Sequence, residues 1–204
     1  MKEKYIEDLK EIKDIMNRSS RFISLSGLSG ISAGISALIG AYIAYQAVYV
    51  QQIHLGYRSI MITNENQTHL LLIALGTLIL ATGSGIYFTT RETKKRNQRI
   101  WDIQTKRLLI NLLIPLLTGG ILCLMLLFKG FIGMLAPLTL IFYGLALVNA
   151  SKYTLNELRS LGLIEIALGL IAIHFIGFGL LFWSIGFGVL HIIYGIIMHL
   201  RYKS

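Results

Sequence analysis

Six long apolar stretches constrain this chain more than any other feature of its sequence. A helix needs about 20 residues to cross a hydrocarbon layer about 30 Å thick, and each stretch is close to that length. The predicted spans cover residues 22–50, 70–90, 108–128, 131–150, 160–176 and 179–200. Composition agrees, because 54% of the 204 residues are hydrophobic and only 14% are charged. We therefore expect an all-α polytopic membrane bundle of six transmembrane helices, with a transmembrane domain at residues 22–200.

Two cytoplasmic segments flank that domain in this prediction. Residues 1–21 are expected to form a short amphipathic helix, because Tyr5, Leu9, Ile12 and Met16 recur at helical spacing along a charged segment. Its apolar side has two open interpretations: it packs back on the cytoplasmic face of the protein, or it pairs with another subunit. Residues 201–204 form a short tail.

The distribution of Lys and Arg predicts the orientation in the membrane. Cytoplasmic loops are enriched in these residues, and an N-terminus on that side puts nearly all of them there. The bases on the predicted cytoplasmic side are Lys2, Lys4, Lys10, Lys13, Arg18, Arg21, Arg91, Lys94, Lys95, Arg96, Arg99, Lys106, Arg107, Lys152, Arg159, Arg201 and Lys203. Arg58 and Lys129 remain outside. Both termini are therefore expected to be cytoplasmic, and the net charge of +9 needs no nucleic-acid partner to explain it.

The loop between the second and third spans combines basic residues with Trp101, a residue typical of the membrane interface. Its candidate contacts to anionic lipid headgroups are Lys94, Lys95, Arg96 and Arg99. The alternative is that these bases only fix the topology. Either way, the bilayer is the first partner that the sequence predicts.

The first span is rich in small residues, which allow neighbouring helix backbones to approach closely. Ser29, Ser32 and Ser36 fall on one side of this helix and form a hydroxyl stripe. Such hydroxyls bond to carbonyls of their own helix, link neighbouring helices or line a water-filled path, and the sequence leaves these alternatives open. Faint similarities among the three helical hairpins also suggest three parallel hairpin units.

Glu165 is the residue that the sequence singles out, because a carboxylate inside a span is costly and normally faces a partner or water. Gly162, Gly169 and Ala172 share its helix face, so it should point into the bundle. Asn111, Asn149 and His199 lie at similar depth by residue count and are its candidate partners. The carboxyl group is then a hydrogen-bonded structural group, a proton- or cation-linked site, or a group that reaches the interface.

His191 completes the candidate intramembrane polar site. No metal-ligating side chain stands three or four residues from it, so a neutral histidine bonded to a neighbouring helix is the favoured interpretation. The sequence contains neither a phosphate-binding glycine loop nor a nucleophile elbow, and Cys123 is its one cysteine. We expect no enzyme activity, no cofactor and no metal.

Two segments carry a resemblance to a known group of proteins. SSRFISLSGLSG at residues 19–30 and LGLIEIALG at residues 161–169 resemble uncharacterised bacterial six-span integral membrane proteins, and the likeness extends over most of the chain. The resemblance implies a bacterial inner (cytoplasmic) membrane and supplies no functional residues.

Two classes of function fit these observations. The first is a membrane-embedded scaffold or regulatory interaction protein that acts through a homo-oligomer or another membrane protein. The alternative is a small ion, proton or solute channel or transporter, in which Glu165 and the serine stripe line the path.

Overall fold

The computed structural model describes residues 26–49, 64–95 and 100–201, together with Ile6, Leu9 and Ile12. The regular elements of these residues are helices, so the all-α class is confirmed. The long elements are α2 (Gly27–Ala44), α3 (Asn64–Lys95), α4 (Ile103–Phe128), α5 (Leu135–Ala150) and α6 (Glu157–His174), followed by α7 (Gly179–Trp183), the π-helix η6 (Ser184–Leu190) and α8 (His191–Arg201) in direct succession. The shorter elements are the π-helix η1 (Tyr45–Tyr49) and the 3-10 turns η3 (Ile132–Met134), η4 (Ser151–Tyr153) and η5 (Ile176–Phe178).

Five helical stretches are long and apolar enough to cross a membrane. They are Gly27–Ala47, Gln67–Lys95, Ile103–Phe128, Ile132–Tyr153 and Ile176–Arg201. They support a multi-pass membrane protein. The remaining predicted span, residues 160–176, overlaps α6, whose 18 residues include the three charged side chains Glu157, Arg159 and Glu165.

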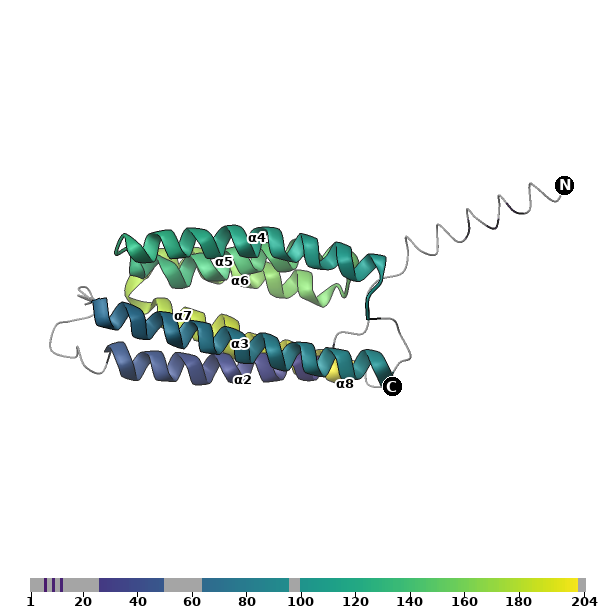
Figure 1. Cartoon of the computed structure of the whole chain (residues 1–204), viewed down its shortest axis with the longest axis horizontal. Coiled ribbons are helices and arrows are strands. Elements are labelled where there is room, and N and C mark those ends of the chain that lie inside the picture. The colour runs from purple at the N-terminus through teal and green to yellow at the C-terminus, as the bar shows by residue number, and fades with distance from the viewer. Residues whose placement is uncertain are drawn as a thin grey trace.

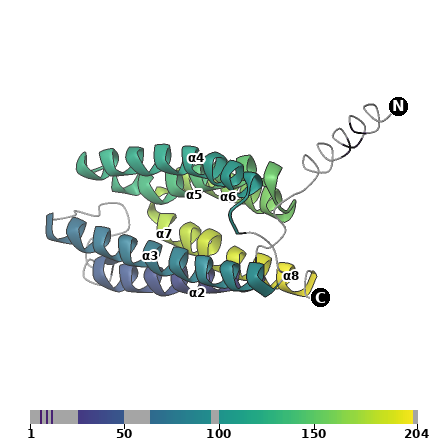
Figure 2. The same ribbon diagram turned by 45° about the vertical axis from the view of Figure 1, so that its right-hand side comes forward.

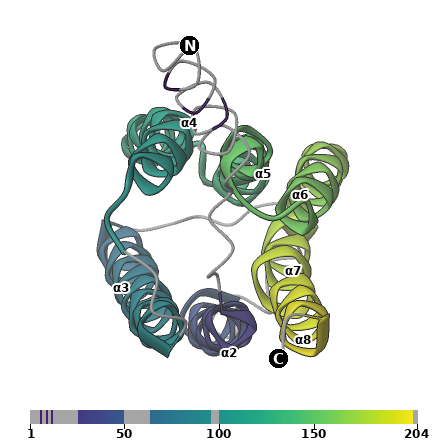
Figure 3. The ribbon, with the colours of Figure 1, turned by 90° about the vertical axis from the view of Figure 1, so that its right-hand side faces the viewer.

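The helices form two groups that the last helix connects (Figures 1 and 2). One group contains α4, α5 and α6, and the other contains α3, α2 and α8. Seen from the end, the helices follow a curved row with α3 and α4 at its two ends (Figure 3). The α3 helix packs mainly on α2, and none of its most apolar 18-residue stretch is buried, so α3 is peripheral.

Glycines bring α2 and the last helix into backbone contact. A Cβ placed on Gly34 would lie 2.7 Å from the carbonyl oxygen of Gly188, and one on Gly195 would lie 2.7 Å from that of Gly27. The start of α2 thus lies beside the end of α8, and the two helices are antiparallel. The small residues of the first predicted span therefore give α2 a central place between α3 and α8.

The contact between α5 and α6 is equally close. A Cβ on Gly144 would lie 2.5 Å from the carbonyl oxygen of Gly162, and one on Gly162 would lie 2.7 Å from the carbonyl oxygen of Gly144. Larger residues at either position would force these two antiparallel helices apart. This contact fixes the position of α6 along the axis of α5, and with it the level in the bundle at which the side chains of α6 lie.

Short turns join the antiparallel neighbours. Gly130 follows α4 with a φ of +82°, and the N–H of Phe131 bonds back to the carbonyl of Leu126 at 2.9 Å, as in a Schellman cap. At the other tight turn, Phe175 and the single turn η5 connect α6 to α7. The connection therefore covers residues 175–178, whereas the predicted spans leave only residues 177–178 between them.

The three predicted hairpins are not packed alike. The helices α2 and α3 are close neighbours, as are α4 and α5. The α6 helix instead packs most closely on α5, and the last helix packs most closely on α2. The reason lies in the glycines, which create close contacts between the hairpins as well as within them.

Most of the predicted cytoplasmic helix at residues 1–21 lies outside the described residues. Ile6, Leu9 and Ile12 are helical, and each is more than half exposed. These three apolar side chains are therefore not buried against the rest of the chain. This finding does not favour the interpretation in which the helix packs back on its own cytoplasmic face.

Candidate functional site

The α6 helix carries one completely buried ionisable residue, Glu165, with an exposed fraction of 0%. Gly162, Gly169 and Ala172 on the same face are buried as well. The face predicted from helical spacing therefore points into the bundle, as expected. The small residues around the carboxyl group let α5 and the last helix approach it.

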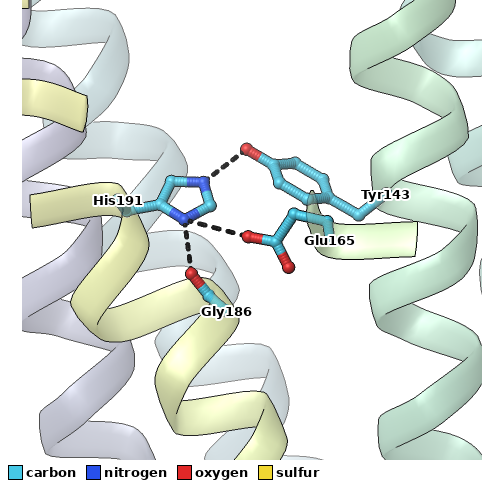
Figure 4. A network of polar contacts seen from close by, with 4 residues as sticks. All are labelled: Tyr143, Glu165, Gly186 and His191. Atoms are coloured by element: carbon cyan, nitrogen blue, oxygen red, sulfur yellow. Dashed lines mark hydrogen bonds and ion pairs between the residues drawn. The ribbon is translucent and has the colours of Figure 1, made fainter. Parts of the chain in front are cut away.

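His191 lies next to Glu165 and bonds to two other groups (Figure 4). Its Nδ1 is 3.0 Å from the carbonyl oxygen of Gly186, and its Nε2 is 2.6 Å from the hydroxyl oxygen of Tyr143. A carbonyl oxygen only accepts, so Nδ1 carries the hydrogen in this arrangement. In the neutral ring Nε2 then accepts a hydrogen bond from Tyr143, and three helices contribute to one polar cluster.

The π-helix η6 supplies the backbone of the site. Such turns interrupt α-helices and are frequent at functional sites. Gly186 lies within η6, and a Cβ on this residue would collide with the Glu165 carboxylate and would lie 2.5 Å from Leu140 Cδ2. Because Glu165 and Leu140 are both completely buried, neither has free space to move into. Gly186 is thus required for the carboxyl group to reach its position.

The contact between Glu165 and His191 is longer than a hydrogen bond. Oε1 of Glu165 is 3.6 Å from Nδ1 of His191, and neither carboxyl oxygen has a hydrogen-bond partner among the described residues. Burial of an unpaired ion in such a place is very costly. Two arrangements avoid a net charge: a protonated Glu165 beside a neutral His191, or a carboxylate beside an imidazolium. They differ by the position of one proton.

The other predicted partners of Glu165 lie elsewhere. The Asn111 side chain donates to the carbonyl of Arg107 in its own helix at 2.8 Å. The Asn149 side chain donates to the carbonyl of Asn111 at 3.1 Å and links α5 to α4. Similar depth by residue count did not predict contact, because depth does not determine which helix faces which.

The serine stripe of α2 is occupied by local hydrogen bonds. Ser29 donates to the carbonyl of Ser26 at 2.5 Å, Ser32 to that of Ser29 at 3.1 Å, and Ser36 to that of Ser32 at 2.9 Å. The first of the three interpretations, bonding within the helix, therefore accounts for these hydroxyls.

Two of the four candidate lipid contacts fall in the described part of the chain. Lys94 and Lys95 end α3 and are exposed, whereas Arg96 and Arg99 lie outside the described residues. Trp101 is 64% exposed, and Asp102 caps α4 by accepting the N–H of Thr105 at 2.6 Å. Exposed bases and an exposed indole thus flank the junction of α3 and α4.

The described residues contain no group of three or more His, Cys, Asp or Glu side chains arranged to hold a metal ion. Cys123 is buried in α4. Comparison with known proteins adds no further assignment: no protein-family model, curated protein or solved structure matches the chain.

Sequence reasoning named Glu165 and His191 but missed Tyr143 and Gly186. Tyr143 lies in an apolar span, where an aromatic residue is ordinary packing material. Its one available signal was a phenol hydroxyl, which needs a hydrogen-bond partner when buried. Gly186 makes room for the Glu165 carboxyl group only because it lies in the π-helix η6, and no residue pattern in the last span predicted a π-helix.

Proposed function

We propose that all six long helices cross the membrane, with both termini of the chain on the cytoplasmic side. The support is the antiparallel packing of α2 against α8, because an even number of crossings returns the chain to its starting side. A salt bridge of 2.8 Å between Arg201 and Glu157 links the end of α8 to the start of α6 at the same end of the bundle. The resemblance of residues 19–30 and 161–169 to bacterial proteins is the basis for placing the chain in an inner membrane.

Within this bundle we propose that Glu165, His191 and Tyr143 form a proton-binding site and that the chain is a proton-linked channel or transporter. One observation carries the proposal: a completely buried carboxyl group without a hydrogen-bond partner among the described residues, 3.6 Å from an imidazole nitrogen. A purely structural carboxyl group would be expected to use its oxygens in hydrogen bonds. Intramembrane chains of Asp, Glu and His are typical of proton pathways.

A proteoliposome assay tests this proposal. The full chain is reconstituted, a pH gradient is imposed, and proton flux is followed with an internal pH dye. Glu165→Gln should abolish the flux, because the amide cannot exchange a proton at this position. Glu157→Gln makes the same change at the start of α6 and should retain most of it. Loss of flux in neither variant, or in both equally, contradicts the assignment to Glu165.

A second function, the scaffold or interaction protein, is favoured by a different observation. Ile6, Leu9 and Ile12 expose one apolar side of the N-terminal segment, and such a side is suited to a partner helix or a second copy of this chain. Deletion of residues 2–17 should then change the oligomeric state or remove a co-purifying protein. An unchanged size and composition would contradict it.

We also propose that anionic lipids contact the junction of α3 and α4. Lys94, Lys95, Lys106 and Arg107 are exposed there, and Trp101 exposes its indole beside them. This combination is typical of the interface with negatively charged headgroups. Lipid that co-purifies with the chain should be enriched in anionic species, and neutralisation of Lys94 and Lys95 should reduce that enrichment.

A further inference from the structure

We propose that His191 relays a proton between the hydroxyl group of Tyr143 and the carboxyl group of Glu165. The inference rests on the proposed proton-binding function and adds the route by which the proton arrives. Tyr143 comes from α5, Glu165 from α6 and His191 from the first position of α8 (Figure 4). The relay therefore connects three helices through side chains alone.

The two nitrogens of His191 face different partners. Nε2 lies 2.6 Å from the Tyr143 oxygen, whereas Nδ1 lies 3.0 Å from the Gly186 carbonyl and 3.6 Å from Oε1 of Glu165. A proton that enters the ring at Nε2 can therefore leave it at Nδ1. The Gly186 carbonyl holds the Nδ1 hydrogen in the resting arrangement, and Glu165 is the alternative acceptor beside it.

Exposure changes in order along the three residues. Tyr143 is partly exposed, His191 is 7% exposed and Glu165 is completely buried. The carboxyl group is thus the most enclosed of the three by surface exposure, and Tyr143 is the residue that keeps some exposed surface. Tyr143 and His191 are the titratable side chains that the neighbouring helices α5 and α8 place beside Glu165.

The transfer balances without any redox step. It starts from the costly state that follows proton release, an ionised Glu165 beside a neutral His191 with hydrogen on Nδ1, and it ends in the uncharged arrangement of a protonated Glu165 beside a neutral His191. The Tyr143 O–H bond breaks as its proton passes to Nε2, and a proton from water replaces it on the tyrosine oxygen. The Nδ1–H bond breaks, and an O–H bond forms on Oε1 of Glu165. The ring ends neutral with hydrogen on Nε2, one proton has entered the site, and release runs through the same bonds in reverse.

Gly186 has a specific part in this route. Its carbonyl orients the imidazole ring, and its missing Cβ leaves room for the carboxyl group. A short movement of the ring from the Gly186 carbonyl to Oε1 would exchange one acceptor for the other. Transfer of a proton to Glu165 therefore depends on where η6 places the Gly186 carbonyl.

Time-resolved infrared spectroscopy on the full chain in detergent tests the relay. After a pH jump, the band of a protonated carboxyl group reports proton arrival, and its absence in Glu165→Gln assigns it to Glu165. Tyr143→Phe should keep the band at equilibrium and slow its appearance at least tenfold. His191→Asn, which retains a side-chain N–H donor for Gly186 but lacks Nε2, should slow it at least as much. Tyr87→Phe makes the matched change on the exposed surface of α3 and should leave the rate unchanged.

The outcomes separate the relay from the proton site. A band that is lost in Glu165→Gln but appears at the wild-type rate in Tyr143→Phe and His191→Asn overturns the relay and leaves the proton site standing. A carboxyl band that does not respond to pH, or is unaffected by Glu165→Gln, overturns the proton site and the relay together. A slowed band in a chain that shows no proton flux in proteoliposomes supports the relay and overturns transport. If His191→Asn fails to fold, the rate at which the carboxyl band appears in Tyr143→Phe alone supports or overturns the relay.

Discussion

The Asn149 side chain in α5 donates a hydrogen bond of 3.1 Å to the main-chain carbonyl of Asn111 in α4. In a regular α-helix this carbonyl would accept the N–H of the residue four positions later. That residue is Pro115, which has no N–H. A neighbouring helix thus satisfies a carbonyl that proline leaves free, as is usual for proline in membrane helices.

Replacement of Asn149 by Leu should lower the free energy of unfolding by about 0.5–2 kcal/mol, the range of interhelical hydrogen bonds in membranes. In a Pro115→Ala background the loss should be close to zero, because an alanine in place of the proline would supply the missing N–H. Unfolding in mixed detergent micelles measures both values. Asn111→Leu is the control, since it keeps the main-chain carbonyl. An equal loss in both backgrounds would show that the proline is irrelevant.

The contact of α5 with α6 should be sensitive to one added methyl group. Gly144→Ala would place a Cβ 2.5 Å from the carbonyl oxygen of Gly162 and should destabilise the fold by about 1–3 kcal/mol. Gly120→Ala in α4 meets nothing within 4 Å and should be neutral or slightly stabilising. Thermal denaturation in detergent compares the two. Similar effects of both changes would argue against the close backbone contact.

Gly186→Ala should disturb the site more than the fold around it. The added methyl group collides with the Glu165 carboxylate and the Leu140 side chain, so the carboxyl group has to leave its position. We expect a loss of proton flux of at least tenfold. Gly85→Ala, with nothing within 4 Å, should retain the flux. A fully active Gly186→Ala chain would contradict the proposed geometry of the site.

The serine stripe of α2 should be dispensable for proton flux. Ser29, Ser32 and Ser36 bond to carbonyls of their own helix, and their joint replacement by alanine leaves the main-chain bonds of that helix intact. The triple variant should therefore conduct within about twofold of the wild-type rate. A reduction in proton flux comparable to that of Glu165→Gln would show that these hydroxyls take part in the proton pathway.

Lys129 and Lys152 should lie on opposite sides of the membrane. Both are exposed and stand at the two ends of the α5 region. In a Cys123→Ser background, Lys129→Cys should react with a membrane-impermeant thiol reagent in intact cells. Lys152→Cys should react only after permeabilisation. Labelling of both positions from the same side would reject the proposed orientation.

Much of the helical architecture followed from apolar periodicity and length. The helices α3, α4 and α5 lie within a few residues of the predicted spans, and differ where polar residues extend a helix or a turn shortens it. Pro137, for example, lies in the first turn of α5, because η3 occupies the start of the predicted span. In the candidate site, a carboxylate within an apolar run was a clear sequence signal, and the small residues around Glu165 correctly predicted its inward face.

Sequence alone determined that this chain is helical and apolar enough for a bilayer. It also determined that one carboxyl group lies within an apolar span, where burial of its charge is costly. These properties could be predicted because helix length and helix face depend on residues close together in the chain. Only the tertiary structure decided that His191 and Tyr143 lie beside that carboxyl group and that Asn111 and Asn149 do not. Those contacts join α5, α6 and α8. They depend on which helices the glycines bring together and on the extra residue of a π-turn. Glycine spacing marks a face that can be approached but does not name the helix that approaches it, and the π-turn leaves no periodic trace in one sequence.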